Sequence, residues 1–148
     1  WDILAVIAVG GALGSLGRWA LGQALVAPLG GFPWATFVEN LSGGFALGVL
    51  MMFVLDVWPP SRYVRPFFGV GVLGGFTTWS TYMLDTRALV VAGRTPLAAM
   101  YLFGTLIAGV AAVWAGILLA RLVAEPGHRR HQRSDDRTDD GLDTRRQS

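Results

Sequence analysis

The sequence contains no cysteine and no lysine, and its two histidines both lie among the last 24 of its 148 residues. The absence of cysteine excludes a disulfide scaffold, a thiolate metal site and a cysteine nucleophile. Charge is also scarce, because residues 1–124 carry only six arginines and four acids, whereas the last 24 residues carry the other six of each. So few charges argue against an ordinary soluble enzyme. Without a basic stripe in the body, we also expect no nucleic-acid partner.

The sequence is rich instead in long apolar runs, at about 3–26, 34–55, 66–91 and 97–122. Each is long enough to cross a hydrocarbon core of ~30 Å, which takes ~20 helical residues. A lipid bilayer offers no partners to exposed backbone groups, so these runs predict an all-α integral membrane protein with four transmembrane helices. We expect a multi-pass protein of the cell membrane, the inner or plasma membrane. Residues 1–124 would form the transmembrane domain, and residues 125–148 a disordered, charged C-terminal tail.

The arginines of the predicted membrane domain do not favour one orientation. Each side of the membrane would carry three of them: Arg62, Arg65 and Arg121 beside the termini, and Arg18, Arg87 and Arg94 opposite. An excess of basic residues normally marks the inner side. A balanced count is typical of a dual-topology protein, which inserts both ways and pairs antiparallel. The alternative is that the arginines of the tail hold both termini inside.

Glycines recur at the spacing of helix–helix contacts, at Gly10, Gly14 and Gly17, at Gly44 and Gly48, and at Gly71 and Gly75. Small residues one helical turn apart let two helix backbones approach closely in lipid. The pattern predicts helix packing faces. In a bundle of only four helices, it also favours packing that is completed by a second chain.

The third apolar run contains the segment GVGVLGGFTTWSTYMLD at residues 69–85. Two adjacent glycines weaken a helix, and the hydroxyls that follow can bond the freed backbone groups. The segment therefore predicts a third helix broken at mid-membrane, which is tolerated only inside protein or beside an aqueous cavity. Carbonyl groups freed at such a break can hold a cation. The alternative is a hydroxyl-rich surface that forms hydrogen bonds across helices.

The stretch GGFTTWSTY resembles the GGFTTFSTF signature of the small fluoride channels, the Fluc or CrcB family. GGALGSLGRWALG at 10–22 and ATFVENLSGGFALG at 35–48 are similar to the motifs of the family's first and second helices. The resemblance extends from residue 3 to about 122. It implies four-helix subunits in an antiparallel dual-topology dimer. It also implies a passive, fluoride-selective channel, not an enzyme, that exports cytoplasmic fluoride and relieves its toxicity.

The resemblance also implies which residues form the site. A structural sodium ion at the dimer centre would be held by main-chain carbonyls of Gly74 and Thr77. The pore and its anion-binding positions would be formed by Arg18, Asn40, Trp79, Ser80, Thr81, Tyr82, Tyr101 and Thr105. Most of these are donors without full charge, which can replace the water around fluoride and still release the ion.

The sequence departs from the family at several positions. Trp79 and Tyr82 replace two phenylalanines, Gly109 stands where many members have serine, and Glu39 stands at a usually apolar position. Asp85 matches a common acid, and we expect it to cap the break or pair with Arg87. An intramembrane acid is a functional hypothesis by default. Glu39 would either be neutral or hydrogen-bonded, or it would influence anion passage.

Two other functions stay open at this point. A proton-coupled small multidrug-type exporter would use Glu39 as its coupling acid, although it has no need for a hydroxyl-rich helix break. Alternatively, the chain would be the non-conducting subunit of a heterodimer with a homologous chain. No GxxxxGK[ST] nucleotide-binding motif is present to drive transport.

Overall fold

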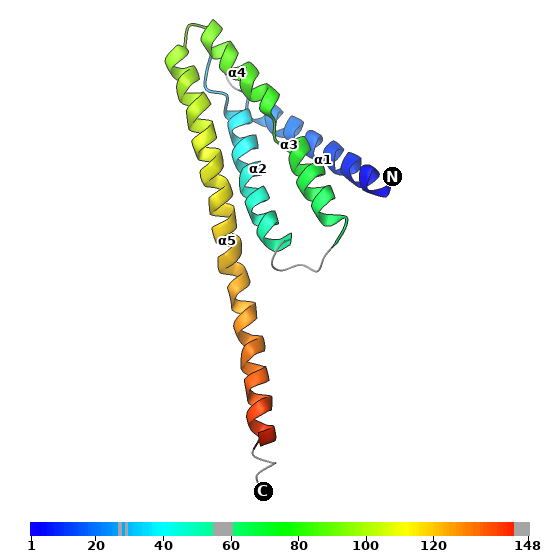
Figure 1. The fold of residues 1–148 in the computed structure, drawn as a ribbon. Helices are drawn as coiled ribbons and strands as arrows, with labels where there is room; N and C mark the ends of the chain where they lie inside the picture. Colours follow the sequence, from blue (N-terminus) through cyan, green and yellow to red (C-terminus); the bar gives the residue numbers. More distant parts are fainter. Residues whose placement is uncertain (27, 29, 55–60, 144–148) are drawn as a thin grey trace.

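The computed structural model describes residues 1–26, 28, 30–54 and 61–143, with side chains up to Ala124. Within these ranges all regular structure is helical, as predicted (Figure 1). The π-helix η2 (Arg65–Leu73) carries Pro66 at its start, and two residues separate the end of α3 (Gly74–Phe76) from the start of α4 (Trp79–Val91). The elements are α1 (Asp2–Ala24), α2 (Trp34–Met52), η2 (Arg65–Leu73), α3 (Gly74–Phe76), α4 (Trp79–Val91) and α5 (Thr95–Asp143).

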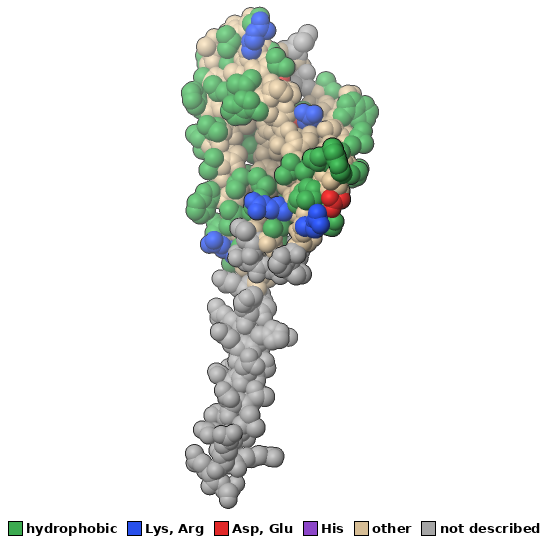
Figure 2. All heavy atoms as spheres, turned by 45° about the vertical axis from the view of Figure 1, so that its right-hand side comes forward, with side chains coloured by type: hydrophobic (Ala, Val, Ile, Leu, Met, Phe, Trp, Pro, Cys, Tyr) green, Lys and Arg blue, Asp and Glu red, His purple; other side chains and the backbone are tan. Residues whose placement is uncertain are grey.

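Three of these helices are long and apolar enough to cross a membrane. They are α1 with 23 residues, α2 with 19, and the first 30 residues of α5, Thr95–Ala124. Hydrophobic side chains are spread over the face of this body, and the few charged groups are scattered (Figure 2). The prediction of a multi-spanning helical membrane protein is confirmed. The third apolar run is divided among η2, α3 and α4, so its crossing as a fourth span stays a prediction.

Glycines determine which helices touch. The helix α1 lies against η2 and α3, while α2 lies against α5 (Figure 1). A Cβ atom at Gly10 would lie 2.6 Å from the Phe67 carbonyl oxygen, and one at Gly14 would overlap the Val72 carbonyl oxygen. Gly48 of α2 meets the Val113 carbonyl of α5 in the same way. The predicted glycine faces are therefore packing faces, and they bring backbones together where lipid gives no hydrophobic drive.

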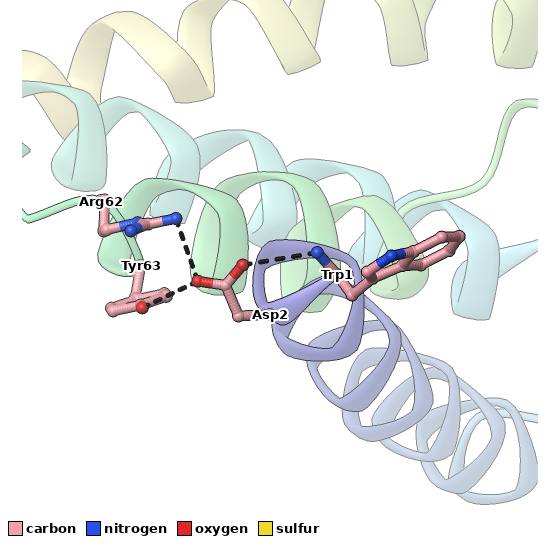
Figure 3. Close-up of polar contacts among 4 residues, drawn as sticks. All are labelled: Trp1, Asp2, Arg62 and Tyr63. Atoms are coloured by element: carbon pink, nitrogen blue, oxygen red, sulfur yellow. Dashed lines mark hydrogen bonds and ion pairs between the residues drawn. The ribbon is translucent and has the colours of Figure 1, made fainter.

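The first residues of α1 are bonded to the segment that leads into η2 (Figure 3). The Asp2 Oδ2 atom accepts a hydrogen bond from the Tyr63 hydroxyl at 2.9 Å and lies 3.0 Å from an Arg62 nitrogen. The Trp1 amino nitrogen lies 3.5 Å from the other oxygen of Asp2. The hydrogen bond to Asp2 raises the pKa of Tyr63. Because these groups are exposed, they stabilise the fold little, but they show that α1 and η2 start at the same end of the bundle.

The helix α5 continues past Ala124 to Asp143, whereas the sequence predicts a disordered tail from residue 125. Figure 1 shows this part of α5 extending beyond all the other helices. A lone helix is held only by its own backbone hydrogen bonds, which are marginal in water. That residues 125–148 form a tail separate from the membrane domain stays a prediction, and residues 144–148 lie outside the described residues.

The glycine contacts predict that two similar substitutions have opposite effects on stability. Gly14→Ala should lower the free energy of unfolding by about 1–3 kcal/mol, because the added methyl group overlaps the Val72 carbonyl. Gly104→Ala in α5 meets nothing within 4 Å and should raise helix stability by up to about 1 kcal/mol. Thermal unfolding of both variants in one detergent measures the difference. Equal stability of the two variants would contradict this packing.

Candidate functional site

The helix formed by η2 and α3 is interrupted at two consecutive threonines. The helix α3 ends at Phe76, Thr77 and Thr78 are extended with ψ angles of 154° and 122°, and α4 begins at Trp79. The Thr78 hydroxyl oxygen accepts a hydrogen bond from the Thr81 backbone N–H at 3.2 Å, as an N-cap residue does. The Thr77 hydroxyl donates to the Leu73 carbonyl at 2.9 Å. The hydroxyls that follow the two glycines therefore end one helix and begin the next.

A side chain from another helix completes this interruption. The Asn40 side chain of α2 donates from Nδ2 to the Thr78 carbonyl at 3.1 Å, and its Oδ1 accepts from the Thr78 backbone N–H at 2.9 Å. Asn40 thus bonds both polar groups of one peptide residue, as a neighbouring strand would. Unpaired backbone groups are costly to bury, so Asn40 allows the chain to be extended at this point.

The interruption also frees main-chain carbonyls. In a continuous helix, the Gly74 carbonyl would accept from the Thr78 N–H, and the Thr77 carbonyl from the Thr81 N–H. Here the Thr78 N–H donates to Asn40, and the Thr81 N–H donates to the Thr78 hydroxyl. Gly74 and Thr77 therefore both lose the donors that a continuous helix would give them.

A cavity of about 350 Å³ lies beside the interruption, between α2, α4 and α5. Its lining includes the polar side chains of Asn40, Thr77, Thr78 and Thr105, and most of the other lining residues are apolar. The described residues that line it are Asn40, Gly44, Thr77, Thr78, Trp79, Tyr82, Thr105, Leu106, Gly109, Val110 and Val113. A largely apolar wall with a few polar groups is typical of a binding site for a small ligand.

The hydroxyl of Thr105 is unusual among the groups that line the cavity. Thr105 is only 5% exposed, yet its Oγ1 atom is buried without a hydrogen-bond partner among the described residues. Leaving a buried polar atom unpaired costs about 1–3 kcal/mol, so such atoms are rare in folded proteins. A hydroxyl in this condition beside a cavity is suited to donate to a ligand that enters it.

Trp79 and Tyr82 lie at the cavity with different surroundings. Their ring centroids are 5.3 Å apart, with Trp79 68% exposed and Tyr82 buried. The Tyr82 hydroxyl donates to the Leu102 carbonyl of α5. Of these two rings, only that of Trp79 therefore presents a large aromatic surface at the outside of the chain.

Two hydroxyls bond Asp85. The Thr36 hydroxyl of α2 donates to its Oδ2 atom at 2.6 Å, and the hydroxyl of the fully buried Tyr101 lies 3.4 Å from the same oxygen. Neither partner is Arg87, although pairing with Arg87 was one of the two roles expected for Asp85, the other being to cap the break. Asp85 of α4 is therefore linked to α2 through Thr36 and to α5 through Tyr101. Thr36 lies one helical turn before Asn40 on α2.

The structure separates the predicted site residues into two groups. Asn40, Thr77, Trp79, Tyr82 and Thr105 meet at the cavity. The others lie outside the lining. The Thr78 hydroxyl donates to the Thr81 Oγ1 atom, and the hydroxyl of the exposed Ser80 lies 3.4 Å from the Thr78 hydroxyl. The Tyr101 hydroxyl bonds Asp85. The lining includes neither Gly74 nor Arg18. These role assignments stay predictions.

Sequence reasoning missed two residues of the site, Thr78 and Thr36. Thr78 belongs to the motif but was not distinguished from its neighbours. Thr36 lies four residues before Asn40, on the same helix face, and this spacing could have indicated it.

Comparisons with known proteins agree with this architecture. Residues 5–117 match the family described as "CrcB-like protein, Camphor Resistance (CrcB)". The chain is 49% identical over 120 residues to "Fluoride-specific ion channel FluC 3" of Streptomyces avermitilis, covering 81% of this chain and 59% of that protein. It is 47% identical over 121 residues to "Fluoride-specific ion channel FluC 1" of Streptomyces coelicolor, covering 82% and 79%. It is 49% identical over 119 residues to "Fluoride-specific ion channel FluC 2" of Nocardia farcinica, covering 80% and 85%. The chain therefore belongs to the CrcB family of multi-pass membrane proteins.

Proposed function

We propose that the chain is a fluoride-specific ion channel, as its relatives are named. The observation that supports this best is the unpartnered Thr105 hydroxyl beside the cavity that Asn40 and Trp79 also line. A transport protein of this family is not an enzyme.

The donors at the cavity suit a small, strongly hydrated anion. The Asn40 Nδ2 atom carries two hydrogens, of which one is donated to Thr78, so the second can face the anion. Thr105 offers a hydroxyl and Trp79 an indole N–H. None of these donors carries a full charge, so they can replace the water of fluoride and still release it. We infer that fluoride passes through the cavity beside these donors.

Dimerisation is part of the same proposal. The cavity lies at the surface of the single chain, and Trp79 is exposed beside it. A second chain laid antiparallel against this face would enclose the pathway and cover the exposed ring. The balanced arginine count supports a dual-topology homodimer, with a heterodimer of homologous chains as the alternative.

The freed carbonyls of Gly74 and Thr77 support the proposal of a structural sodium ion. Main-chain carbonyl oxygens are hard ligands that suit a hard cation, and both have lost the donors that a continuous helix would give them. In an antiparallel dimer the two interruptions would face each other, so that each chain supplies half of the ligands. The bound ion would supply positive charge at the centre of the dimer.

Passive conduction is sufficient for the proposed role. Hydrogen fluoride crosses membranes and dissociates inside the cell, so an anion pore lets fluoride leave down its electrochemical gradient. A proton-coupled exporter would instead require a proton gradient, and a non-conducting subunit would pass no fluoride when alone.

Fluoride release from liposomes that contain only this chain tests the function. We expect rapid release, measured with a fluoride electrode, that needs no proton gradient and is not matched by chloride. Asn40→Asp should reduce release to the level of empty liposomes, because a carboxylate cannot donate to Thr78 and repels the anion. Ser42→Ala, at an exposed serine of the same helix, is the matched control and should release fluoride like the parent.

Other outcomes would overturn specific parts of the proposal. Release that depends on a proton gradient would identify an exporter, and no release would identify a non-conducting subunit. Undiminished flux in Asn40→Asp would remove Asn40 from the pathway.

Trp79 and Tyr82 should affect the fluoride rate differently. Trp79→Phe removes an exposed indole N–H, and the loss of one hydrogen bond of ~1 kcal/mol corresponds to about a fivefold change in rate. Tyr82→Phe removes a hydroxyl that already bonds Leu102, so its main effect should be on stability. Fluoride release from both purified variants and the double variant measures the difference. An unchanged rate and an unchanged selectivity over chloride in Trp79→Phe would make that ring a packing residue.

A further inference from the structure

A second cavity, the apolar groove, lies between α2 and η2. It has a volume of about 340 Å³, and its wall includes the ring of Phe68, which is 44% exposed, so the groove opens to the outside of the chain. The described residues of its lining are all apolar, and it therefore offers no hydrogen-bond donor to an anion. They are Phe45, Ala46, Val49 and Leu50 of α2, its C-cap residue Phe53, and Phe68 and Leu73 of η2.

The apolar groove and the cavity at the interruption lie on different sides of α2. On this helix the cavity is lined by Asn40 and Gly44, and the groove by residues such as Ala46 and Val49. With 3.6 residues per turn, Ala46 and Val49 lie roughly half a turn around the helix from Asn40 and Gly44. A second chain laid over the cavity would therefore leave the groove facing lipid.

The length of the apolar groove matches the depth of one leaflet of a bilayer. Phe53 follows Phe45 by eight residues, a rise of about 12 Å along the helix axis. One leaflet contributes about half of a hydrocarbon core of ~30 Å. An acyl chain runs through a leaflet in the same direction as a membrane-spanning helix such as α2. The groove therefore suits an acyl chain in both length and polarity.

A basic side chain lies at the end of the bundle where the groove reaches Phe53. The helix η2 begins there with Arg65, which is exposed and precedes Phe68 by three residues. Among the residues described with side chains, Arg62 is paired with Asp2, but Arg65 has no ion pair. Figure 2 shows arginine side chains near the lower end of the body, where Figure 1 places the start of η2. A free guanidinium is suited to bind a phosphate through two parallel hydrogen bonds.

We propose that the apolar groove binds an anionic phospholipid of the surrounding bilayer, with an acyl chain between α2 and η2 and the headgroup phosphate on Arg65. A zwitterionic lipid fills the groove equally well, but its headgroup also carries a cation that Arg65 repels. The inference rests on the membrane-spanning fold and does not depend on which ion the protein transports. Because the lipid contacts both helices, it also stabilises the packing of α2 against the segment that leads into the interruption.

Native mass spectrometry of the full chain in detergent tests the proposal. The chain is titrated with dioleoyl phosphatidylglycerol, which is anionic, or with dioleoyl phosphatidylcholine, which is zwitterionic and has the same acyl chains. The first phosphatidylglycerol should bind about fivefold more tightly than the first phosphatidylcholine, which is the effect of about one basic residue beside an anionic headgroup. Equal affinity of the parent for the two lipids would overturn the proposal.

One pair of variants tests the headgroup contact. Arg65→Gln should lose the preference for phosphatidylglycerol and bind phosphatidylcholine as the parent does. Arg87→Gln removes the same charge from an exposed position of α4, at the other end of the bundle in Figure 1. It is the matched control and should keep the preference. A preference that survives in Arg65→Gln would show that the phosphate is not bound there.

A second pair tests the acyl chain. Ala46→Phe fills the groove and should weaken the binding of both lipids several-fold. Ala12→Phe makes the same enlargement at an exposed position of α1 and should bind both lipids like the parent. If Ala46→Phe instead lowers the fraction of dimer in the same spectra and leaves lipid binding unchanged, the groove receives a second copy of the chain and the inference is wrong. Arg65 is exposed, so its variant keeps the proposal testable if Ala46→Phe does not fold.

Discussion

The pairing of Asn40 with Thr78 is the interaction on which the rest of the site depends. One side chain satisfies both the N–H and the carbonyl of a residue that lies outside any helix. Without it, two buried backbone groups would lose their partners, and the chain would gain by closing into a continuous helix. The extended threonines, the freed carbonyls of Gly74 and Thr77, and the start of α4 at Trp79 all follow from this one amide.

Close backbone contacts keep that pairing in place. Asn40 can reach Thr78 only if α2 and the interrupted segment lie close together, and few side chains stand between the helices. Gly43, one turn from Asn40 on α2, leaves room for the Thr77 side chain, which a Cβ atom there would overlap. Gly14 and Gly48 serve the same purpose for the neighbouring helix pairs. The glycines therefore support the polar site, because they let the helices approach closely enough for the Asn40 side chain to reach Thr78.

The sequence was most informative where a feature depends on neighbouring residues. Apolar runs predicted the three long helices, and the spacing of Gly10, Gly14 and Gly48 predicted packing faces. The GGFTT segment predicted a third helix broken at mid-membrane, because glycines and hydroxyls act on their own backbone. The structure has an interruption at Thr77 and Thr78, while its place in a membrane span stays a prediction. These features need no knowledge of which helix lies beside which.

Hydrogen bonds between residues far apart in the sequence could not be predicted from patterns of neighbouring residues. Thr36 bonds Asp85 across 49 positions, and Asn40 bonds Thr78 across 38. Both roles expected for Asp85, to cap the break or to pair with Arg87, considered only neighbours in the sequence, whereas in the structure two hydroxyls from other helices bond it. Likewise, Tyr82 was expected to direct its hydroxyl to the anion, but Leu102 of α5 takes that hydrogen bond. In each case the preferred partner is chosen by packing, which a single sequence does not reveal.

The buried hydroxyl of Thr105 also has a thermodynamic consequence for the fold as a whole. A fold that carries an unpaired polar atom is less stable than it would be with a partner for that atom, and an anion that accepts its hydrogen supplies the partner. Any such ligand binds the folded chain and not the unfolded one, so occupancy and folding are linked, and stability rises with the logarithm of ligand concentration above its dissociation constant. The proposed channel would thus be most stable when its proposed ligand, fluoride, is abundant.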